Sequence, residues 1–325
     1  MISRRSAIGF LALAAAAAAP MGSALAADYP TRPVKWVVGY PPGGATDIIA
    51  RLIGQRLSER LGQQFVIENK PGAGNNIATE SVINAEPDGY TLLLVNPANY
   101  INTSLYANLK FNVPRDVAPV AAFNRVPNVM TVNKDVPAKT VAEFIAYVKA
   151  NPGKVNLASS GNGTSVHLSG EMFMAMSGAK MQHVPYRGAA LALTDLIGGQ
   201  VQVIFDNMPS VIQHIRSGAL RALAVTSTTK SPLLPDVPAL ADTIPGYEAS
   251  ALFGMGAPKN TPKDIIEKLN KEVNAVLAEP AIKARLTELG GEPLIGPPEA
   301  FGAMIVAETE KWKKVIEDAK IQKVE

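Results

Sequence analysis

The 325-residue sequence contains no cysteine and only three histidines. Without cysteine the chain forms neither a disulfide nor a thiolate zinc site, and it offers no cysteine for a lipid anchor. The histidines, His167, His183 and His214, stand at none of the spacings of metal-binding motifs, so we expect no metal and no other cofactor. Basic residues exceed acidic ones by only three, 31 against 28. This near balance excludes the electrostatics of a nucleic-acid partner.

The first 26 residues differ in character from the rest. Arg4 and Arg5 precede an alanine-rich apolar stretch over 8–19, which the small residues Ala24-Leu25-Ala26 follow. This order predicts a secretory signal peptide, removed after residue 26, whose apolar core is too short to span a bilayer. No other long apolar run occurs, and loss of the signal lowers the formal net charge from +3 to +1. We expect a protein of the bacterial periplasm, exported by either the Sec or the twin-arginine route.

Apolar runs of strand length alternate with amphipathic helical stretches, which is the pattern of an α/β fold. The predicted strands cover 34–40, 64–68, 91–95, 155–158, 181–184, 201–205, 221–226 and 249–257, with an extended segment at 119–133. The predicted helices cover 46–61, 75–85, 140–150, 262–278, 281–289 and 298–320. Three more are predicted between 165 and 216: one begins after the loop at 159–165, one ends at 197 and one ends at 216. The stretch 96–100 is predicted to be a loop.

The last predicted strand comes late in the chain and only helices follow it. We therefore expect two lobes, the first built from 27–124 and 250–325 and the second from 125–249. The chain would cross between them at Pro119–Asn133 and at Tyr247–Pro258, and two crossings make a hinge. Loops that follow strands of both lobes would then face each other across a ligand cleft.

The stretch G-Y-P-P-G-G-A-T-D at 39–47 follows a buried strand and opens a helix at once. Its glycines allow close approach of the backbone, and the first N–H groups of the helix carry partial positive charge. Gly43, Gly44 and Ala45 are therefore predicted to seat an anion. Asp47 in the first helical turn would repel that anion, so we expect its carboxylate to cap its own helix.

A second loop, S-S-G-N-G-T-S at 159–165, offers hydroxyl groups, two glycines and another helix N-terminus. Ser159, Ser160, Gly161, Gly163 and Thr164 are groups that hydrogen-bond a carboxylate without a counter-charge. An ordinary glycine-rich turn with a Thr or Ser N-cap has the same sequence pattern. Pairing with the first loop favours the anion seat.

Three further residues are candidates for the cleft. Arg187 in P-Y-R-G has two interpretations: it binds a ligand carboxylate directly, or it is a solvated surface residue. Asp206 follows a buried strand, which would place its carboxylate in the cleft. Asn207 is more simply a helix cap. His167 beside the serine loop raises the alternative of a periplasmic ester hydrolase with Ser160 or Ser165 as nucleophile. Because no G-x-S-x-G elbow and no acid partner accompany this pair, we expect no enzyme and no catalytic residue.

Six motifs occur in order along the chain: V-V-x-Y-P-P-G-G-x-x-D, V-x-E-N-K-P-G-A-G, E-P-D-G-Y-T-L-L, H-V-P-Y-R-G, F-D-N-x-P-S-V and L-R-A-L-A-V-T-S. With them, residues 28 to 320 closely resemble the Bug family, the extracytoplasmic solute receptors of tripartite tricarboxylate transporters. The resemblance implies a two-lobe periplasmic binding fold, type II-like, with two mixed sheets flanked by helices. It also implies a small carboxylate-bearing ligand held by backbone N–H groups, hydroxyls and waters of the two loops, with its tail contacting Tyr40, Asn96, Arg187 and Asp206.

We therefore expect a monomeric periplasmic receptor that closes on a small organic acid or amino-acid-like ligand and delivers it to membrane permease subunits. A sensor receptor that presents the ligand to a signalling partner stays an alternative, as does, less strongly, the hydrolase. The candidate ligand-binding residues are Tyr40, Gly43, Gly44, Ala45, Asp47, Asn96, Ser159, Ser160, Gly161, Gly163, Thr164, His167, Arg187 and Asp206.

Overall fold

The computed structural model describes residues 29–325, so the predicted signal peptide lies outside the described residues. Within 29–325, no helix combines the length and the apolar character that crossing a bilayer requires.

The β-α-β-α-β unit predicted at the start of the chain is present. It consists of β1 (Val34–Val38), α1 (Ala45–Leu61), β2 (Phe65–Asn69), α2 (Asn76–Ile83), with the short η1 (Ala73–Asn75) ahead of it, and β3 (Thr91–Val95). β1 pairs in parallel with both β2 and β3. Its residues Val34, Trp36 and Val38 are fully buried because helices cover the sheet.

The predicted loop at 96–100 is wrong, because α3 (Pro97–Leu105) begins there. Asn96 is its N-cap and accepts a hydrogen bond from Ala98 N–H, while the Asn99 side chain accepts one from Asn96 N–H. An Asn followed by Pro is a recognised helix start, with Pro at a position whose N–H needs no partner. The same pair of residues is also typical of turns, so the sequence alone favoured the loop.

The remaining elements follow the predicted order, with three short additions, α4, η2 and β10. They are α4 (Val113–Asp116), β4 (Val117–Asn133), α5 (Val141–Ala150), β5 (Asn156–Ser159), α6 (Ser165–Ser177), β6 (Gln182–Pro185), α7 (Ala189–Ile197), β7 (Val203–Asn207), α8 (Met208–Arg216), β8 (Leu220–Val225), η2 (Leu240–Asp242), β9 (Ser250–Pro258), α9 (Lys263–Ala278), α10 (Pro280–Glu288), β10 (Glu292–Pro293) and α11 (Pro298–Asp318).

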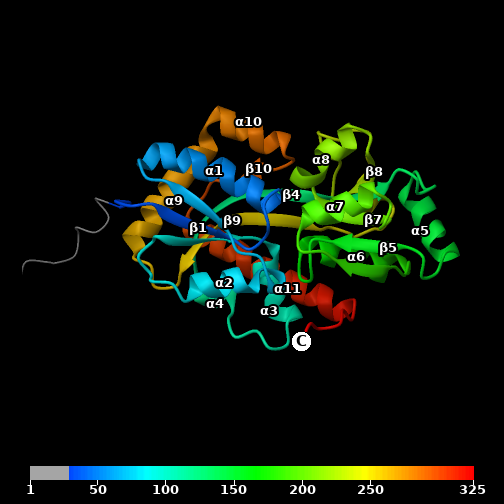
Figure 1. Ribbon diagram of the computed structural model, residues 1–325, viewed down its shortest axis with the longest axis horizontal. Coiled ribbons are helices and arrows are strands. Elements are labelled where there is room, and N and C mark those ends of the chain that lie inside the picture. The colour runs from blue at the N-terminus through cyan, green and yellow to red at the C-terminus, as the bar shows by residue number, and fades with distance from the viewer. Residues whose placement is uncertain (1–28) are drawn as a thin grey trace, which may run out of the picture.

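One long strand, β4, joins the two mixed sheets that the sequence predicts. The strand order is β2-β1-β3-β9-β4-β7-β5-β6, and β10 and β8 also pair with β4. β4 pairs with β9 over residues 117–127 and with β7 and β8 over residues 128–133. In Figure 1 β4 and β9 run through the middle of the molecule, with α1, α9 and α10 on one side and α5 to α8 on the other. The α/β fold with its flanking helices is confirmed, and the exact limits of the two lobes stay a prediction.

The two chain crossings lie side by side. Pro127 on β4 pairs with Ser250 on β9. One residue further, Asn128 N–H donates to Thr226 Oγ1 at 2.7 Å, and Ala249 N–H donates to the Thr226 carbonyl at 3.0 Å. The chain therefore enters and leaves the predicted second lobe at one hydrogen-bonded locus.

Part of the core is shared between the lobes. Phe173 and Phe205 of the second lobe, with ring centroids 5.3 Å apart, belong to the same buried cluster as Phe301 and Trp312 of α11. α11 also packs against α3 and β4. This helix thus contributes buried side chains beneath the junction of both lobes.

Candidate functional site

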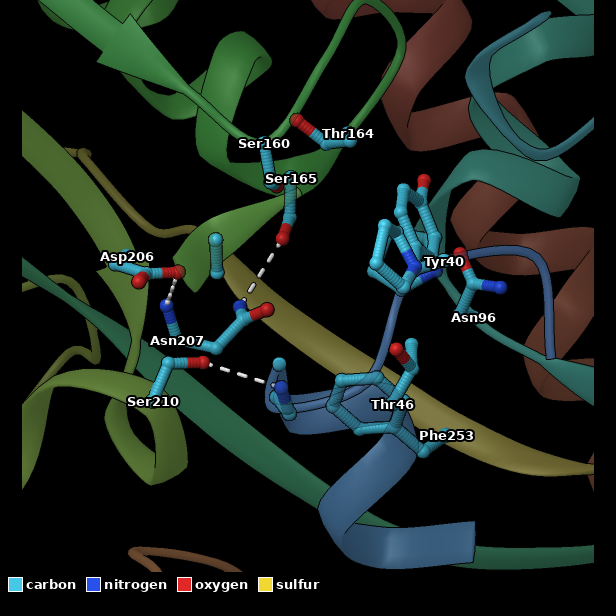
Figure 2. A pocket seen from close by; sticks show the side chains of 15 residues that line it. Tyr40, Thr46, Asn96, Ser160, Thr164, Ser165, Asp206, Asn207, Ser210 and Phe253 are labelled. Atoms are coloured by element: carbon cyan, nitrogen blue, oxygen red, sulfur yellow. Dashed lines mark hydrogen bonds between the residues drawn. The ribbon is translucent and has the colours of Figure 1, made fainter. Parts of the chain in front are cut away.

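The two loops predicted to seat an anion line one pocket between the lobes (Figure 2). Seven predicted residues reach it: Tyr40, Gly44, Ala45, Asn96, Ser160, Thr164 and Asp206. The pocket is also lined by Pro41, Thr46, Pro97, Ser165, Ala189, Asn207, Ser210 and Phe253.

The Asp47 carboxylate stabilises the first loop by accepting a hydrogen bond from its backbone. Gly43, at φ +94°, donates its N–H to Asp47 Oδ2 at 3.1 Å, and Arg51 and Asn69 donate to the same carboxylate. Burial acts to raise the pKa of the Asp47 carboxyl, but the hydrogen bonds from Arg51, Asn69 and Gly43 lower it overall. The expected cap is wrong in detail, because the N-cap Gly44 provides no side-chain cap and Asp47 binds an N–H ahead of the helix. Its charge is thereby neutralised behind the loop.

A contact between the lobes occupies one of the predicted anion donors. Ala45 N–H donates to Ser210 Oγ of α8 at 3.1 Å (Figure 2). The first loop also approaches Gly188, the N-cap of α7, since a Cβ on Gly188 would lie 3.1 Å from Pro41 Cδ. The N–H groups of Thr46 and Asp47 in the first turn of α1 keep no intrahelical acceptor, as in any helix. The first turn of α1 therefore still presents donors near the pocket.

The second loop is shaped by glycines in left-handed conformations. Gly161 has φ +124° and Gly163 has φ +76°. Thr164 Oγ1 accepts from His167 N–H at 3.1 Å and donates to the Gly161 carbonyl at 2.8 Å, so Thr164 is the N-cap of α6. Ser160 also lines the pocket, and the hydrogen bonds of the described residues leave its hydroxyl out of the cap. The cap interpretation is therefore correct for Thr164, and the anion seat stays a prediction for the loop.

Asp206 is the one carboxylate among the residues that line this pocket. Its Oδ1 accepts Asn207 N–H at 2.8 Å, whereas its Oδ2 is buried without a hydrogen-bond partner. Burial raises the pKa of the Asp206 carboxyl to about 7, although the bond from Asn207 N–H acts to lower it. This side chain is therefore ready to accept a hydrogen bond from a ligand or to donate its own proton.

Asn207 occupies the N-cap position of α8 but its side chain caps nothing. The amide instead donates to Asn128 Oδ1 at 2.6 Å and to Ser165 Oγ at 3.1 Å. The simple cap interpretation of Asn207 is therefore wrong, because its side chain ties the hinge strand β4 to the first residue of α6.

The pocket is small and opens beside a larger cavity. Its volume of about 30 Å³ has room for roughly two water-sized groups, which matches the two oxygens of one carboxylate. The neighbouring cavity of about 470 Å³ shares Tyr40 and Ser160 with it and is also lined by Gly161 and Arg187. The Tyr40 hydroxyl is buried without a partner, and burial raises its pKa above the ordinary range. It is thus a donor available at the junction of the two cavities.

Five predicted residues line neither cavity: Gly43, Asp47, Ser159, Gly163 and His167. Ser159 Oγ is 2.6 Å from Nε2 of His183, a residue that the sequence analysis did not place at the site. The rings of His167 and His183 stack with centroids 4.1 Å apart. Burial, with His167 beside it, lowers the pKa of His183 to about 3. Ser159, His167 and His183 therefore contact one another on the side of the second loop away from the two cavities.

The serine–histidine pairs of the hydrolase alternative are not assembled. His167 Nδ1 accepts Gly163 N–H at 3.4 Å, and its Nε2 lies 3.5 Å from Glu171 Oε1. Ser165 Oγ accepts from Asn207 instead. Nothing in these contacts favours nucleophilic catalysis.

Sequence reasoning missed several lining residues. Thr46 and Ser210 each lie in the first turn of a helix that follows a strand, and such positions could have been nominated by the same rule that selected Gly44. Phe253 lies in the middle of β9, where no local signal marks it. Asn96 was expected in the cleft and lines it, although its side chain also caps α3.

Comparison with known proteins identifies the family of this chain. Residues 49–321 match the model of the tripartite tricarboxylate transporter family receptor. Protein BugT of Bordetella pertussis is 37% identical over 314 residues, which cover 96% of this chain and 95% of BugT. Among solved structures, R. palustris Rpa4515 with adipate has a TM-score of 0.89 at 38% identity and covers 91% of this chain and 100% of its own.

A second solved structure has a different ligand. MatC (Rpa3494) from Rhodopseudomonas palustris with bound malate has a TM-score of 0.84 at 31% identity, covering 89% of this chain and 100% of that one. The resemblance seen in the sequence motifs is confirmed by a family model that matches most of the chain and by relatives that span nearly all of it. The chain belongs to the receptor family of the tripartite tricarboxylate transporters, the Bug solute-binding receptors.

Proposed function

We propose that this receptor works in the periplasm, captures a small dicarboxylate between its lobes and delivers it to a tripartite tricarboxylate-type permease. The observation that carries the proposal is the pocket of about 30 Å³ between the first turns of α1 and α6. Beside the Asp206 carboxyl and apolar side chains such as Phe253, it is lined by hydroxyls, amides and helix N-termini, without a lysine or arginine. Such neutral donors suit one carboxylate group.

A second carboxylate would lie in the larger cavity. Arg187 is the basic residue among those that line it, and the side chain is exposed at the cavity wall. Tyr40 and Ser160 connect the two cavities, so a ligand with an acid at each end would span them. The relatives with adipate and with malate support a dicarboxylate, since both of these ligands carry two carboxylate groups.

Asp206 would select the chemical group that the ligand carries next to its bound carboxylate. Its unpartnered Oδ2 accepts a hydrogen bond from a ligand hydroxyl or ammonium group at the α-position. A ligand without such a group, such as adipate, would require the protonated carboxyl. We therefore expect hydroxylated or amino dicarboxylates to bind better than plain ones as the pH rises above about 7.

Binding would stabilise the closed arrangement of the lobes. The Ala45–Ser210 hydrogen bond and the Gly188–Pro41 contact join the two lobes beside the pocket. A ligand that touches both lobes only when they are closed shifts the population by its difference in affinity for the two states. Small-angle scattering that stays unchanged at saturating ligand would refute this closure.

Calorimetry on the purified receptor tests the ligand class. Adipate and malate are compared with hexanoate, which has one carboxylate, and with hexanediol, which has none. We expect both dicarboxylates to bind more tightly than hexanoate and hexanediol not to bind. Equal affinity for hexanediol, or no heat with any acid after unfolding and refolding to remove retained ligand, would overturn the proposal.

A variant pair locates the second carboxylate. Arg187→Met should weaken adipate binding by about tenfold or more, equivalent to about 1.4 kcal/mol, and leave hexanoate binding unchanged. Arg216→Met on exposed α8 surface is the matched control and should change neither affinity. Equal loss for both acids in Arg187→Met would refute a role for Arg187 at the distal carboxylate.

The partner is tested separately. Delivery predicts that the loaded receptor drives uptake through its permease in vesicles. A sensor role predicts instead a ligand-dependent complex with a signalling protein and no uptake.

A further inference from the structure

A cluster of metal-ligating side chains lies behind the second ligand loop, outside both cavities. His167 and Glu171 stand one helical turn apart on α6, and His183 reaches them from β6. One ligand atom from each residue lies within 4.8 Å of the others. His167 is buried, whereas Glu171 and His183 are half-buried, so an ion has access from solvent.

We propose that His167, Glu171 and His183 bind a divalent transition-metal ion such as Zn²⁺. Two imidazoles and one carboxylate are a donor set that zinc accepts, with a water molecule in the fourth position. Zinc holds such atoms at about 2.0–2.2 Å, which places ligand atoms roughly 3.3 Å apart in a tetrahedral site. His167 Nε2 and Glu171 Oε1 are 3.5 Å apart and nearly meet this spacing already. The distances to the His183 nitrogen have to shorten by up to about 1.5 Å.

The surroundings orient one of the imidazoles. His183 Nε2 is hydrogen-bonded with Ser159 Oγ at 2.6 Å, which leaves Nδ1 as its metal-binding nitrogen. Such an outer hydrogen bond fixes the tautomer and the ring direction of a metal-binding histidine. The rings of His167 and His183 stack at 4.1 Å with an angle of 17° between their planes. Because a bound ion lies in the plane of each imidazole that holds it, one ring has to tilt out of this stack when the metal binds.

Metal binding at this cluster would act on the ligand loop. His167 Nδ1 accepts Gly163 N–H at 3.4 Å, and its Nε2 faces Glu171. When Nε2 binds a metal, the proton of the neutral ring moves to Nδ1, which then no longer accepts from Gly163. The Gly163 N–H is released in the loop that presents Ser160 to the pocket. Metal occupancy is therefore coupled to the affinity for the carboxylate ligand.

The experiment uses the untagged mature receptor, since a polyhistidine tag would bind metal itself. After removal of metal with a chelator, Zn²⁺ is titrated by calorimetry and Co²⁺ by its visible absorption. We expect one ion per chain and the intense d–d bands of tetrahedral Co²⁺. Glu171→Gln should weaken binding by about tenfold or more and His183→Asn further still.

The chain supplies its own control, because His214 is the one other histidine of the sequence and lies in the last turn of α8. His214→Gln should bind Zn²⁺ like the unaltered protein. No heat and no thermal shift at Zn²⁺ up to about 1 mM would overturn the site. Binding that persists in Glu171→Gln and is lost in His214→Gln would overturn it equally.

A second readout tests the coupling. Adipate is titrated with and without saturating Zn²⁺ into the unaltered protein and into Glu171→Gln. A changed adipate affinity in the unaltered protein alone supports the coupling, whereas identical affinities in all four titrations refute it. If adipate binds nowhere, the thermal shift with Zn²⁺ still decides the metal site, so the two proposals fail separately.

Discussion

Asp206 makes the stability of the ligand-free receptor depend on pH in a direction opposite to that of most carboxylates. Its side chain is 1% exposed, and burial raises its pKa to about 7 from an ordinary 3.8. The folded state therefore holds the proton more tightly than the unfolded state. Stability is greatest below the ordinary pKa and falls as the pH rises from about 4 to about 7, where the folded group ionises.

The size of the effect follows from the shift. About three pKa units correspond to roughly 4 kcal/mol when the buried group is fully ionised. At pH 5 only about 1.6 kcal/mol of this cost is present, and at pH 8 essentially all of it. Asp206→Asn removes the charge and keeps an oxygen to accept Asn207 N–H. Its gain in stability over the unaltered protein should therefore be larger at pH 8 than at pH 5 by about 2 to 3 kcal/mol.

Urea unfolding of both proteins at pH 5 and pH 8 measures this difference. Other titrating groups change both proteins alike and cancel in the comparison. Asp242→Asn, which alters an exposed carboxylate in η2, is the matched control and should show the same stability difference at both pH values. If Asp206→Asn stabilises the protein equally at pH 5 and pH 8, ionisation of the buried Asp206 carboxyl does not destabilise the folded state as predicted.

Three other substitutions, two of them with a control variant, test how the loops and the shared core are built. Gly163→Ala should lose about 2 kcal/mol or more in thermal unfolding, because φ is +76° and the added methyl would lie 1.9 Å from a buried amide oxygen. Gly153→Ala, at φ +74° in open space, should lose only about 1 kcal/mol. Phe173→Ala should lose about 3 to 5 kcal/mol in urea, and Met176→Ala, 42% exposed on the same helix, less than about 0.5. Asp47→Ala should lower the free energy of unfolding at neutral pH, because the folded state lowers the pKa of the Asp47 carboxyl. This loss should shrink as the pH falls and the carboxylate is protonated. Equal losses at all pH values would contradict the prediction.

Elements with a clear period were predictable from the sequence. The strands and helices of the first lobe follow from alternation of buried runs with amphipathic stretches, and β4 was expected as one extended segment. The place of both loops at one pocket was predictable because glycines between a strand and a helix are typical of a backbone that a ligand approaches closely. The start of α3 was missed because Asn-Pro serves turns and helix caps alike.

Contacts between distant segments were not predictable in the same way. Ser210 lies 165 residues from Ala45, and the Ser159–His183 and His167–His183 contacts depend on the pairing of β5 with β6. Metal-binding motifs are defined by short spacings within one helix or loop. They therefore could not predict that His183 lies beside His167. The sequence correctly placed Asp47 in the first turn of α1. That its carboxylate accepts the Gly43 N–H follows from the left-handed conformation of Gly43, which the sequence does not specify.

The adjacency of the two chain crossings has a consequence for how such receptors diversify. Because Pro127 pairs with Ser250, and Asn128 and Ala249 both bond to Thr226, the segment between them is an insertion whose two ends meet. An insertion of this kind can be exchanged as a block with little strain at its borders. The second lobe of a relative, joined at these two points, would bring its own serine loop and its own residue at position 187 to an unchanged first loop. New ligand preferences would then arise by recombination of whole half-sites as well as by single substitutions.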